Sequence, residues 1–197
     1  MSRLITNAIR STSATADAIT MDGSGNVTFP ANATCSGTAT GFGKILQVIQ
    51  TVKTDTASTT NEDNFEDISG MSVTITPSAT SSKILVMVDM RLSTNENKNV
   101  AYRLMRGSTQ IYMGDASGNI TRATGSIRLE GAAKAEMQTE GAIFLDSPST
   151  TSATTYKVQW TNTYHTNASY INRPYESTDS NDRVRAASSI TVQEVAA

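Results

Sequence analysis

The chain has 197 residues and a formal charge of −2, and this length allows one β domain of ordinary size plus an appendage. Lys and Arg form no cluster, and no stretch approaches the roughly 20 apolar residues of a membrane span, so we expect neither nucleic-acid binding nor membrane insertion. Ser and Thr make up roughly a quarter of the chain, above ordinary globular usage. A thin core under a hydroxyl-rich surface is common in particle-surface β proteins and uncommon in metabolic enzymes.

Residues 1–36 form a low-complexity arm that is too poor in large apolar residues to fold alone. Its apolar positions between residues 4 and 9 are spaced for one face of a short helix, and an extended strand is the alternative. Either form buries little surface, so the arm needs neighbours. Five of its side chains are candidates for anchoring it to a larger particle: Arg3, Leu4, Ile5, Ile9 and Arg10.

Residues 18–29 predict a β-hairpin, because two apolar stubs flank the turn sequence Asp22-Gly-Ser-Gly-Asn26. A single hairpin is marginally stable at best. Residues 1–10 lack the apolar core of a secretory signal, so we expect the protein to be made in a cytoplasm and not exported by that route. The lone Cys35 excludes an internal disulfide.

Residues 37–43 read Gly-Thr-Ala-Thr-Gly-Phe-Gly and predict a glycine-rich hinge between the arm and a compact β domain at 44–197. Within the domain, residues 71–76 alternate cleanly, with apolar side chains predicted to point inward. About ten short strands at regular spacing predict an all-β fold, an antiparallel sandwich or barrel. The other strand candidates are 44–52, 83–92, 99–106, 109–114, 125–130, 135–145, 154–164, 168–172 and 188–195.

Two segments of the domain have less regular patterns. Residues 44–52 are apolar on both faces, as expected for a strand that is covered on both sides. Residues 126–140 contain good helix formers, but Gly131 interrupts them and their apolar positions are sparse. A strand, a loop and a second strand are the favoured prediction there.

The acidic residues Glu62, Asp63, Glu66 and Asp67 bring four carboxylates into six positions. A Ca²⁺ site or a glycosidase acid–base pair would use such groups, but the glycine turn and evenly spaced ligands of a calcium loop are missing. A solvated loop is the favoured interpretation. His165 is the only histidine, and the sequence has no nucleophile elbow or phosphate loop. We therefore expect no catalytic, cofactor-binding or metal-binding residues.

Residues 160–175 concentrate large polar aromatic side chains in one hairpin region, with asparagines and an arginine beside them. Aromatic rings stack on sugars and anchor protein interfaces, so a surface that binds a host glycan or protein is one interpretation. The favoured interpretation is that Tyr156, Val158 and Trp160 are alternating core positions and that the tyrosines cap strand ends or a subunit interface. The candidate residues are Trp160, Tyr164, His165, Tyr170, Arg173 and Tyr175.

Seven segments carry a likeness to a known group of proteins. They are 2–5, 22–29 and 37–43 in the arm, and 45–52, 65–77, 80–86 and 187–195 in the domain. Together they resemble virion fibre and appendage proteins of marine tailed phages, of the cyanophage and pelagiphage kind. The resemblance covers nearly the whole chain and implies a jelly-roll-like β-sandwich that forms a homotrimer, with the arm docking on the particle.

The function expected from these observations is that of a non-enzymatic virion structural protein, without a cofactor. Its arm would bind other virion proteins of the tail, adaptor or capsid, and its domain would project outward, where it could contact a host cell-surface glycan or protein. The alternative is a capsid decoration protein that stabilises the head. A glycan depolymerase is disfavoured, because the chain is short and lacks a β-helix repeat. A free lectin is a further, weaker option.

Overall fold

The computed structural model describes residues 8–9, 19–24, 26–29, 45–95, 97–130 and 135–196. The chain divides into two units, Met1–Phe42 and Gly43–Ala197, and each is described by itself. Every regular element of the described residues is a β-strand, which confirms the all-β prediction. Among these residues there is no helix long and apolar enough to cross a membrane.

The N-terminal unit contains a small antiparallel sheet of β1 (Ala8–Ile9), β2 (Ile19–Met21) and β3 (Val27–Thr28). Strands β2 and β3 form the predicted hairpin, and the side chain of Asp22 stabilises its turn. Asp22 Oδ1 accepts hydrogen bonds from the backbone N–H groups of Ser24 and Asn26, both at 2.9 Å. Ile9 therefore lies in a strand. The other anchoring candidates, the hinge at 37–43 and Cys35 lie outside the described residues.

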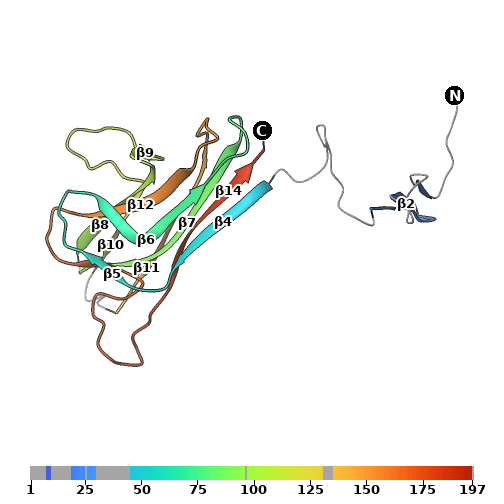
Figure 1. The fold of residues 1–197 in the computed structure, drawn as a ribbon. Coiled ribbons are helices and arrows are strands. Elements are labelled where there is room, and N and C mark those ends of the chain that lie inside the picture. Colours follow the sequence, from blue (N-terminus) through green and yellow to red (C-terminus); the bar gives the residue numbers. More distant parts are fainter. Residues whose placement is uncertain are drawn as a thin grey trace. The chain divides into compact units, whose positions relative to one another are not determined.

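The C-terminal unit consists of two antiparallel sheets (Figure 1). The first sheet contains, in spatial order, β4 (Ile45–Lys53), β14 (Ser188–Val195), β7 (Lys83–Ser93) and β11 (Gln138–Asp146). Two short strands extend it beside the end of β7, namely β13 (Ser169–Ile171) and β5 (Ala57–Thr59). The second sheet contains β10 (Gly125–Leu129), β8 (Lys98–Arg106), β12 (Thr154–Thr163) and β6 (Glu66–Ile75), with β9 (Thr109–Ile111) paired to β8.

The order of the eight longer strands is that of a jelly roll. Along the chain they cross from one sheet to the other at every step except β8 to β10, which are neighbours in the second sheet. The result is two four-stranded sheets, β4-β14-β7-β11 and β6-β12-β8-β10, as in double-sheet jelly rolls. This confirms the expected antiparallel β-sandwich of jelly-roll type. The strands near 126–140 also agree with the favoured prediction, since β10 and β11 flank this segment.

The core lies between the two sheets and follows from strict alternation along the strands. Met71, Val73 and Ile75 of β6 are buried, as predicted, while Ser72 and Thr74 are exposed. Successive side chains of a strand point to opposite faces, so each strand supplies every second residue to the core. The largest apolar side chains that are fully buried are Trp160, Tyr156, Met71, Ile75, Ile84, Met90, Leu92, Leu104, Leu129, Ile171 and Ile190.

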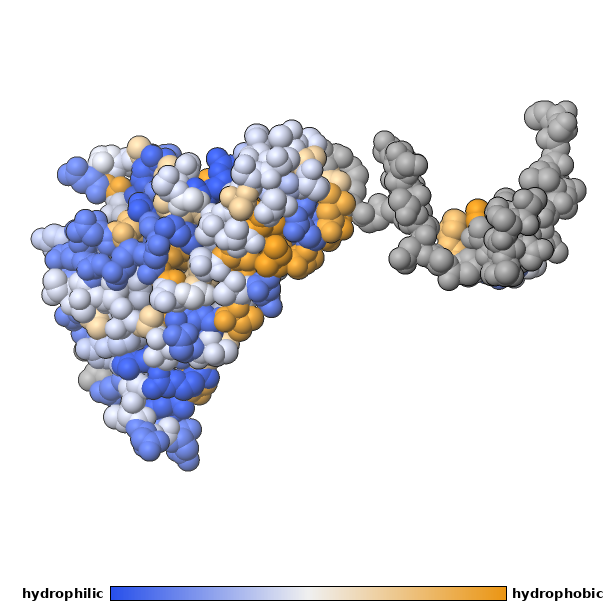
Figure 2. Space-filling model, viewed as in Figure 1, coloured by the Kyte–Doolittle hydropathy of each residue, from blue (hydrophilic) through white to orange (hydrophobic). Residues whose placement is uncertain are grey.

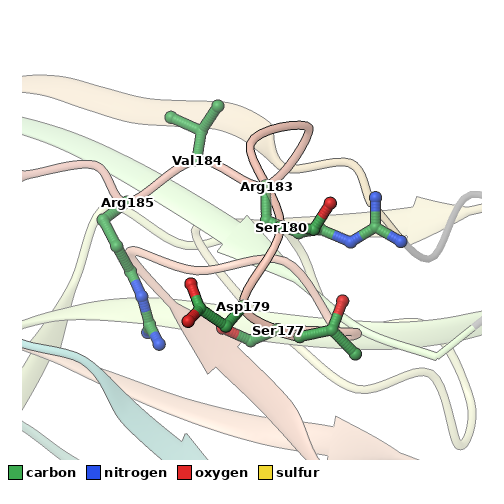
Figure 3. Close-up of a pocket in the computed structure, with 7 residues that line it drawn as sticks. Ser177, Asp179, Ser180, Arg183, Val184 and Arg185 are labelled. Carbon is green, nitrogen blue, oxygen red and sulfur yellow. The ribbon is translucent and has the colours of Figure 1, made fainter.

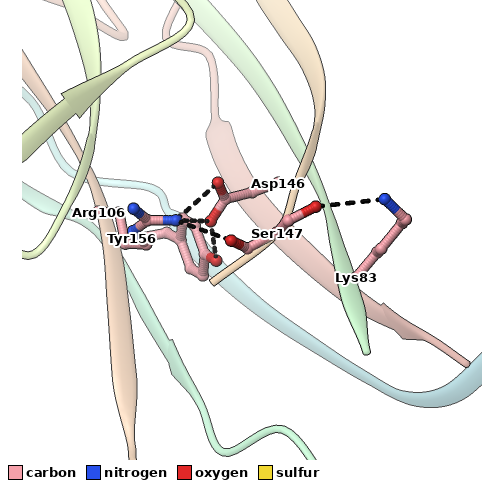
Figure 4. Close-up of polar contacts among 5 residues, drawn as sticks. All are labelled: Lys83, Arg106, Asp146, Ser147 and Tyr156. Atoms are coloured by element: carbon pink, nitrogen blue, oxygen red, sulfur yellow. Dashed lines mark hydrogen bonds and ion pairs between the residues drawn. The ribbon is translucent and has the colours of Figure 1, made fainter. Parts of the chain in front are cut away.

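A polar network joins the two sheets near the ends of β11 and β12 (Figure 4). The buried Asp146 of β11 accepts a hydrogen bond of 2.6 Å from Tyr156 Oη of β12, and also accepts hydrogen bonds from Arg106 of β8. Burial, together with the hydrogen bond to Asp146, raises the pKa of Tyr156. Next to this network, Lys83 donates to Ser147 Oγ at 3.2 Å.

Strand β4 differs from its prediction. The pattern of residues 44–52 predicts cover on both sides, but β4 is an edge strand that packs on the core with one face only. Its outward side chains Leu46, Val48 and Val52 are 52%, 56% and 54% exposed. Strand propensity and core burial account for the inward residues, whereas the outward residues have no cover from the described part of this chain.

Candidate functional site

The predicted aromatic region 160–175 divides into buried and exposed parts. Trp160 is 2% exposed and belongs to the core, in phase with Tyr156 and Val158 on β12. His165 is also buried, and its Nε2 lies 2.8 Å from the carbonyl oxygen of Asn99. Neither ring is free to stack on a ligand. The interpretation of Trp160 and His165 as surface residues is therefore corrected, because the inward phase of β12 and the packing of its end against β8 bury them.

Tyr164 has the opposite environment. It follows the last residue of β12, is 89% exposed and has a positive φ of 60°. Such a backbone conformation is uncommon for a bulky residue and favours glycine or asparagine. Its backbone N–H lies 3.4 Å from Asp63 Oδ1. Tyr164 thus lies exposed in the segment after β12, and its ring takes no part in the ring contact between Tyr170 and Tyr175.

The structure brings together three of the predicted residues, Tyr170, Arg173 and Tyr175, which we call the Tyr170 cluster. The guanidinium carbon of Arg173 lies 3.9 Å from the centroid of the Tyr170 ring, a cation–π contact. The rings of Tyr170 and Tyr175 meet edge to face with their centroids 5.9 Å apart. Arg173 also donates hydrogen bonds to the carbonyl oxygens of Pro174, at 3.2 Å, and of Tyr175, at 3.0 Å. These contacts fix the guanidinium in place.

A buried asparagine shapes the turn that carries this cluster. Asn172 has a positive φ of 64°, which turns the chain directly after β13 so that Arg173 can fold back over Tyr170. The Asn172 side chain donates to the carbonyl oxygens of Lys53, at 2.8 Å, and Asp55, at 2.9 Å, and accepts from Ser188 Oγ at 2.6 Å. Asparagine tolerates this left-handed conformation better than most residues do. The side-chain amide of Asn172 therefore fixes this turn through three hydrogen bonds.

The Tyr170 cluster lies on the outward side of the first sheet. Ser93 pairs with Tyr170 across the sheet, and Ser93 Oγ donates a 2.7 Å hydrogen bond to the carbonyl oxygen of Arg173. Both Tyr170 and Arg173 are partly exposed, and no carboxylate in the described residues forms an ion pair with Arg173. A stacked ring beside an available cation suits a binding role toward sugar hydroxyls or carboxylates. It supplies no nucleophile or base.

The acidic residues 62–67 form a solvated loop and the start of β6. Asp67 accepts hydrogen bonds from Lys157 Nζ at 2.7 Å and Gln159 Nε2 at 2.6 Å. Burial raises the pKa of Asp67, but these two hydrogen bonds and the Lys157 charge outweigh it, so that the pKa is lowered. In the described part of the chain no three His, Cys, Asp or Glu side chains lie together as a metal site would require.

The loop between β13 and β14 contains a shallow polar hollow of about 360 Å³ (Figure 3). All of its lining comes from this one loop, and Arg183 in its wall pairs with Asp182 and, at 3.4 Å, with Glu176. The sequence does not single out this hollow, because it has no motif. The hollow is open and a single loop forms it, so it is a weaker site than the Tyr170 cluster. The lining residues are Ser177, Thr178, Asp179, Ser180, Arg183, Val184 and Arg185.

No protein-family model matches the chain, and no curated protein matches its sequence.

Proposed function

We propose that this protein is a non-enzymatic structural component of a virion, anchored by its N-terminal arm and projecting its jelly-roll domain. The observation that carries the proposal is the exposure of apolar side chains in the small sheet of the arm. Met21 of β2, Val27 of β3 and Phe29, which directly follows β3, are 39%, 50% and 50% exposed, and the two strands are only three and two residues long. A sheet this small needs a further partner to bury its apolar face.

The domain supports the same proposal by its architecture. Double-sheet jelly rolls occur in viral capsid and lectin domains, which are built to present surfaces. The Tyr170 cluster offers a ring and a cation on such a surface, as expected for adsorption to a host glycan or protein. We propose a homotrimer as the assembled form, because three copies would bring three arms to one attachment point.

The experiment uses a virus from which the gene for this protein has been removed. The protein is supplied in trans as wild type or as one of two valine variants. Val27→Asp places a charge in the arm, and the matched control Val184→Asp does so in the domain, where Val184 is 60% exposed. Quantitative mass spectrometry measures the amount of each chain in purified particles. We expect wild type and V184D to be present in similar amounts and V27D to be depleted about tenfold or more. Absence of the wild-type chain from particles would refute the proposal.

A truncated chain tests the division between arm and domain. A chain that lacks residues 1–43 should retain the β-sheet circular dichroism of the jelly roll and fail to attach to particles. An unfolded product would contradict this division, and attachment without the arm would show that the domain carries the anchor.

A further inference from the structure

The outward face of the first sheet carries an apolar patch that extends over its strands. The register aligns Val48 of β4, Gln193 of β14, Leu85 of β7 and Leu145 of β11 in one row across all four strands. The next row places Ile143 beside Met87. We call this surface the outer apolar face. Its members are Leu46, Val48, Val52, Leu85, Met87, Ile143 and Leu145.

The side chains at both edges of this face are the most exposed. On β4, Leu46, Val48 and Val52 are each more than half exposed, and on β11 Ile143 is 69% and Leu145 48% exposed. Figure 2 shows hydrophobic surface over the part of the domain where β4 and β14 lie. A cluster of this kind differs from the single exposed apolar residues that any protein surface contains.

The second sheet shows what a water-facing surface of this chain looks like. Most of its outward side chains are polar, and several bond to one another: Thr74 with Thr155 at 2.8 Å, and Arg103 with Gln159 at 2.8 Å. Met105 also faces outward there, beside Lys157, but is only 4% exposed. Lys157 adds an ion pair of 2.7 Å with an aspartate. The polar groups of the second sheet's outer face therefore pair with one another. The outer face of the first sheet also contains a polar pair, Gln50 Nε2 with Thr191 Oγ1 at 2.8 Å, but exposes aliphatic side chains on both of its edge strands. This asymmetry indicates that the outer apolar face is covered in the assembled protein.

The dimensions of the face suit a protein interface. Four strands about 4.8 Å apart, with residues rising about 3.4 Å along each, give a side of roughly 20 Å and a flat footprint on the order of 400 Å². In a trimer each such face would meet both neighbours around a threefold axis, so that three faces together bury roughly 1,200 Å² before the relief of their side chains is counted. Charged residues lie at its margins, Lys83 at one end and Asp89 with Arg91 toward the other, as in interfaces with an apolar centre and a polar rim.

We propose that the outer apolar face is where copies of this chain pack on one another, and this inference rests on the proposed trimeric appendage. Copies of this face can meet around a threefold axis without charge repulsion, because its members are apolar and none carries a charge. It also continues to Ile45, the first described residue of the domain, which pairs with Val195 of the last strand. The arm is joined to the domain through the chain that precedes Ile45, on edge strand β4, so association through this face would bring the points of attachment of the arms together.

The test uses two isoleucines of nearly equal exposure in the full chain. Ile143→Glu introduces a charge into the face, and the control Ile120→Glu introduces the same charge in a loop after β9, where the isoleucine is 72% exposed against 69% for Ile143. Sedimentation equilibrium of wild-type protein should give about three times the 21.0 kDa chain mass. We expect I120E to retain this mass and I143E to associate about tenfold more weakly or to be monomeric.

Circular dichroism checks that each variant folds. If I143E does not fold, Val48→Thr replaces it, because threonine keeps the β-branched shape of valine. V48T should weaken association several-fold. A wild-type monomer, including one whose own arm covers the face, would overturn the inference, as would equal association of I143E and I120E. In the latter case the trimer itself would stand. A dimer that I143E dissociates would keep the face and refute the trimer, while attachment to particles is decided separately by the V27D experiment.

Discussion

Asp146 and Arg106 connect the two sheets of the jelly roll through two hydrogen bonds of 2.9 Å from one guanidinium nitrogen to both carboxylate oxygens. Asp146 is 5% exposed, and it also accepts the Tyr156 hydroxyl. Removing this carboxylate would leave a buried hydroxyl and a partly buried cation without their acceptor. The stability of the sandwich where β11 meets β8 and β12 should therefore depend on Asp146.

We expect Asp146→Ala to lower the free energy of unfolding by about 2–4 kcal/mol, since it removes the buried partner of a partly buried ion pair and the acceptor of the Tyr156 hydroxyl. The control is Asp89→Ala, because Asp89 pairs with Arg91 on the surface with its side chain 54% exposed. That change should be worth less than about 1 kcal/mol. Urea denaturation measures both values, and an equal loss in the two variants would contradict a structural role for Asp146.

The stability of the domain should fall at acidic pH through Glu194. Burial raises its pKa, but hydrogen bonds from Ser78, Ser82 and Gln47 outweigh burial and lower the pKa from 4.5 to about 2. The distances to Ser78 N, Ser78 Oγ and Gln47 Nε2 are 2.7, 2.6 and 2.6 Å. The folded state thus binds this proton less well than the unfolded state. Its contribution, roughly 2–3 kcal/mol, is present above pH 4.5 and is lost as the pH falls toward 2.

Glu194→Gln provides the comparison for this pH dependence. The variant should be less stable than wild type at pH 7 and lose less further stability between pH 4.5 and about 2. The free energy of unfolding measured at several pH values decides the matter. Parallel curves for the two proteins would mean that Glu194 does not carry the acid sensitivity.

Trp160 and Tyr164 are four residues apart and should respond oppositely to substitution. Trp160→Ala is expected to cost about 3–5 kcal/mol, because it opens a cavity between the sheets. Tyr164→Asn should change stability by less than about 0.5 kcal/mol, since asparagine tolerates the positive φ and the ring is solvated. Thermal unfolding compares them, and a large loss in Y164N would show that its ring has a packing role.

The Tyr170 cluster gives a prediction about adsorption. Arg173→Ala should reduce binding of purified protein or particles to host cells about tenfold or more and leave the fold intact, since it removes the stacked cation. Tyr164→Ala is the matched control, an exposed aromatic outside the cluster. A flow-cytometric binding assay measures both. Equal binding by R173A and wild type would exclude the cluster from adsorption.

The sequence predicts local features of this fold well, because alternation is a property of each strand alone. The strand over 188–195 is observed with the predicted bounds, and the inward side of β6 is as expected. The sequence does not predict strand β5, since its three residues Ala57–Thr59 carry no pattern, and its pairing partner β13 lies more than a hundred residues away. Short strands depend on such partners, which the sequence does not reveal.

The sequence also predicts the candidate surfaces only in part. Alternation along 156–160 predicts that Trp160 is a core residue with Tyr156 and Val158, and the structure confirms it, whereas the hydrogen bond between His165 and Asn99 joins residues that are distant in the sequence. The excess of apolar residues in 45–52 is visible in the sequence. Only the register of β7 with β11 puts Ile143 beside Met87 and completes the outer apolar face.

Cryo-electron microscopy of intact virus particles tests the central claim most directly. The account predicts density for the jelly roll in groups of three, with the N-terminal arm inserted into the particle and the domain outside. Groups at a few positions on the tail or its adaptor would mark an adsorption appendage, and groups repeated over the head lattice a decoration protein. Particles of wild-type virus that contain no such density, and no trace of the chain, would contradict a structural role in the virion.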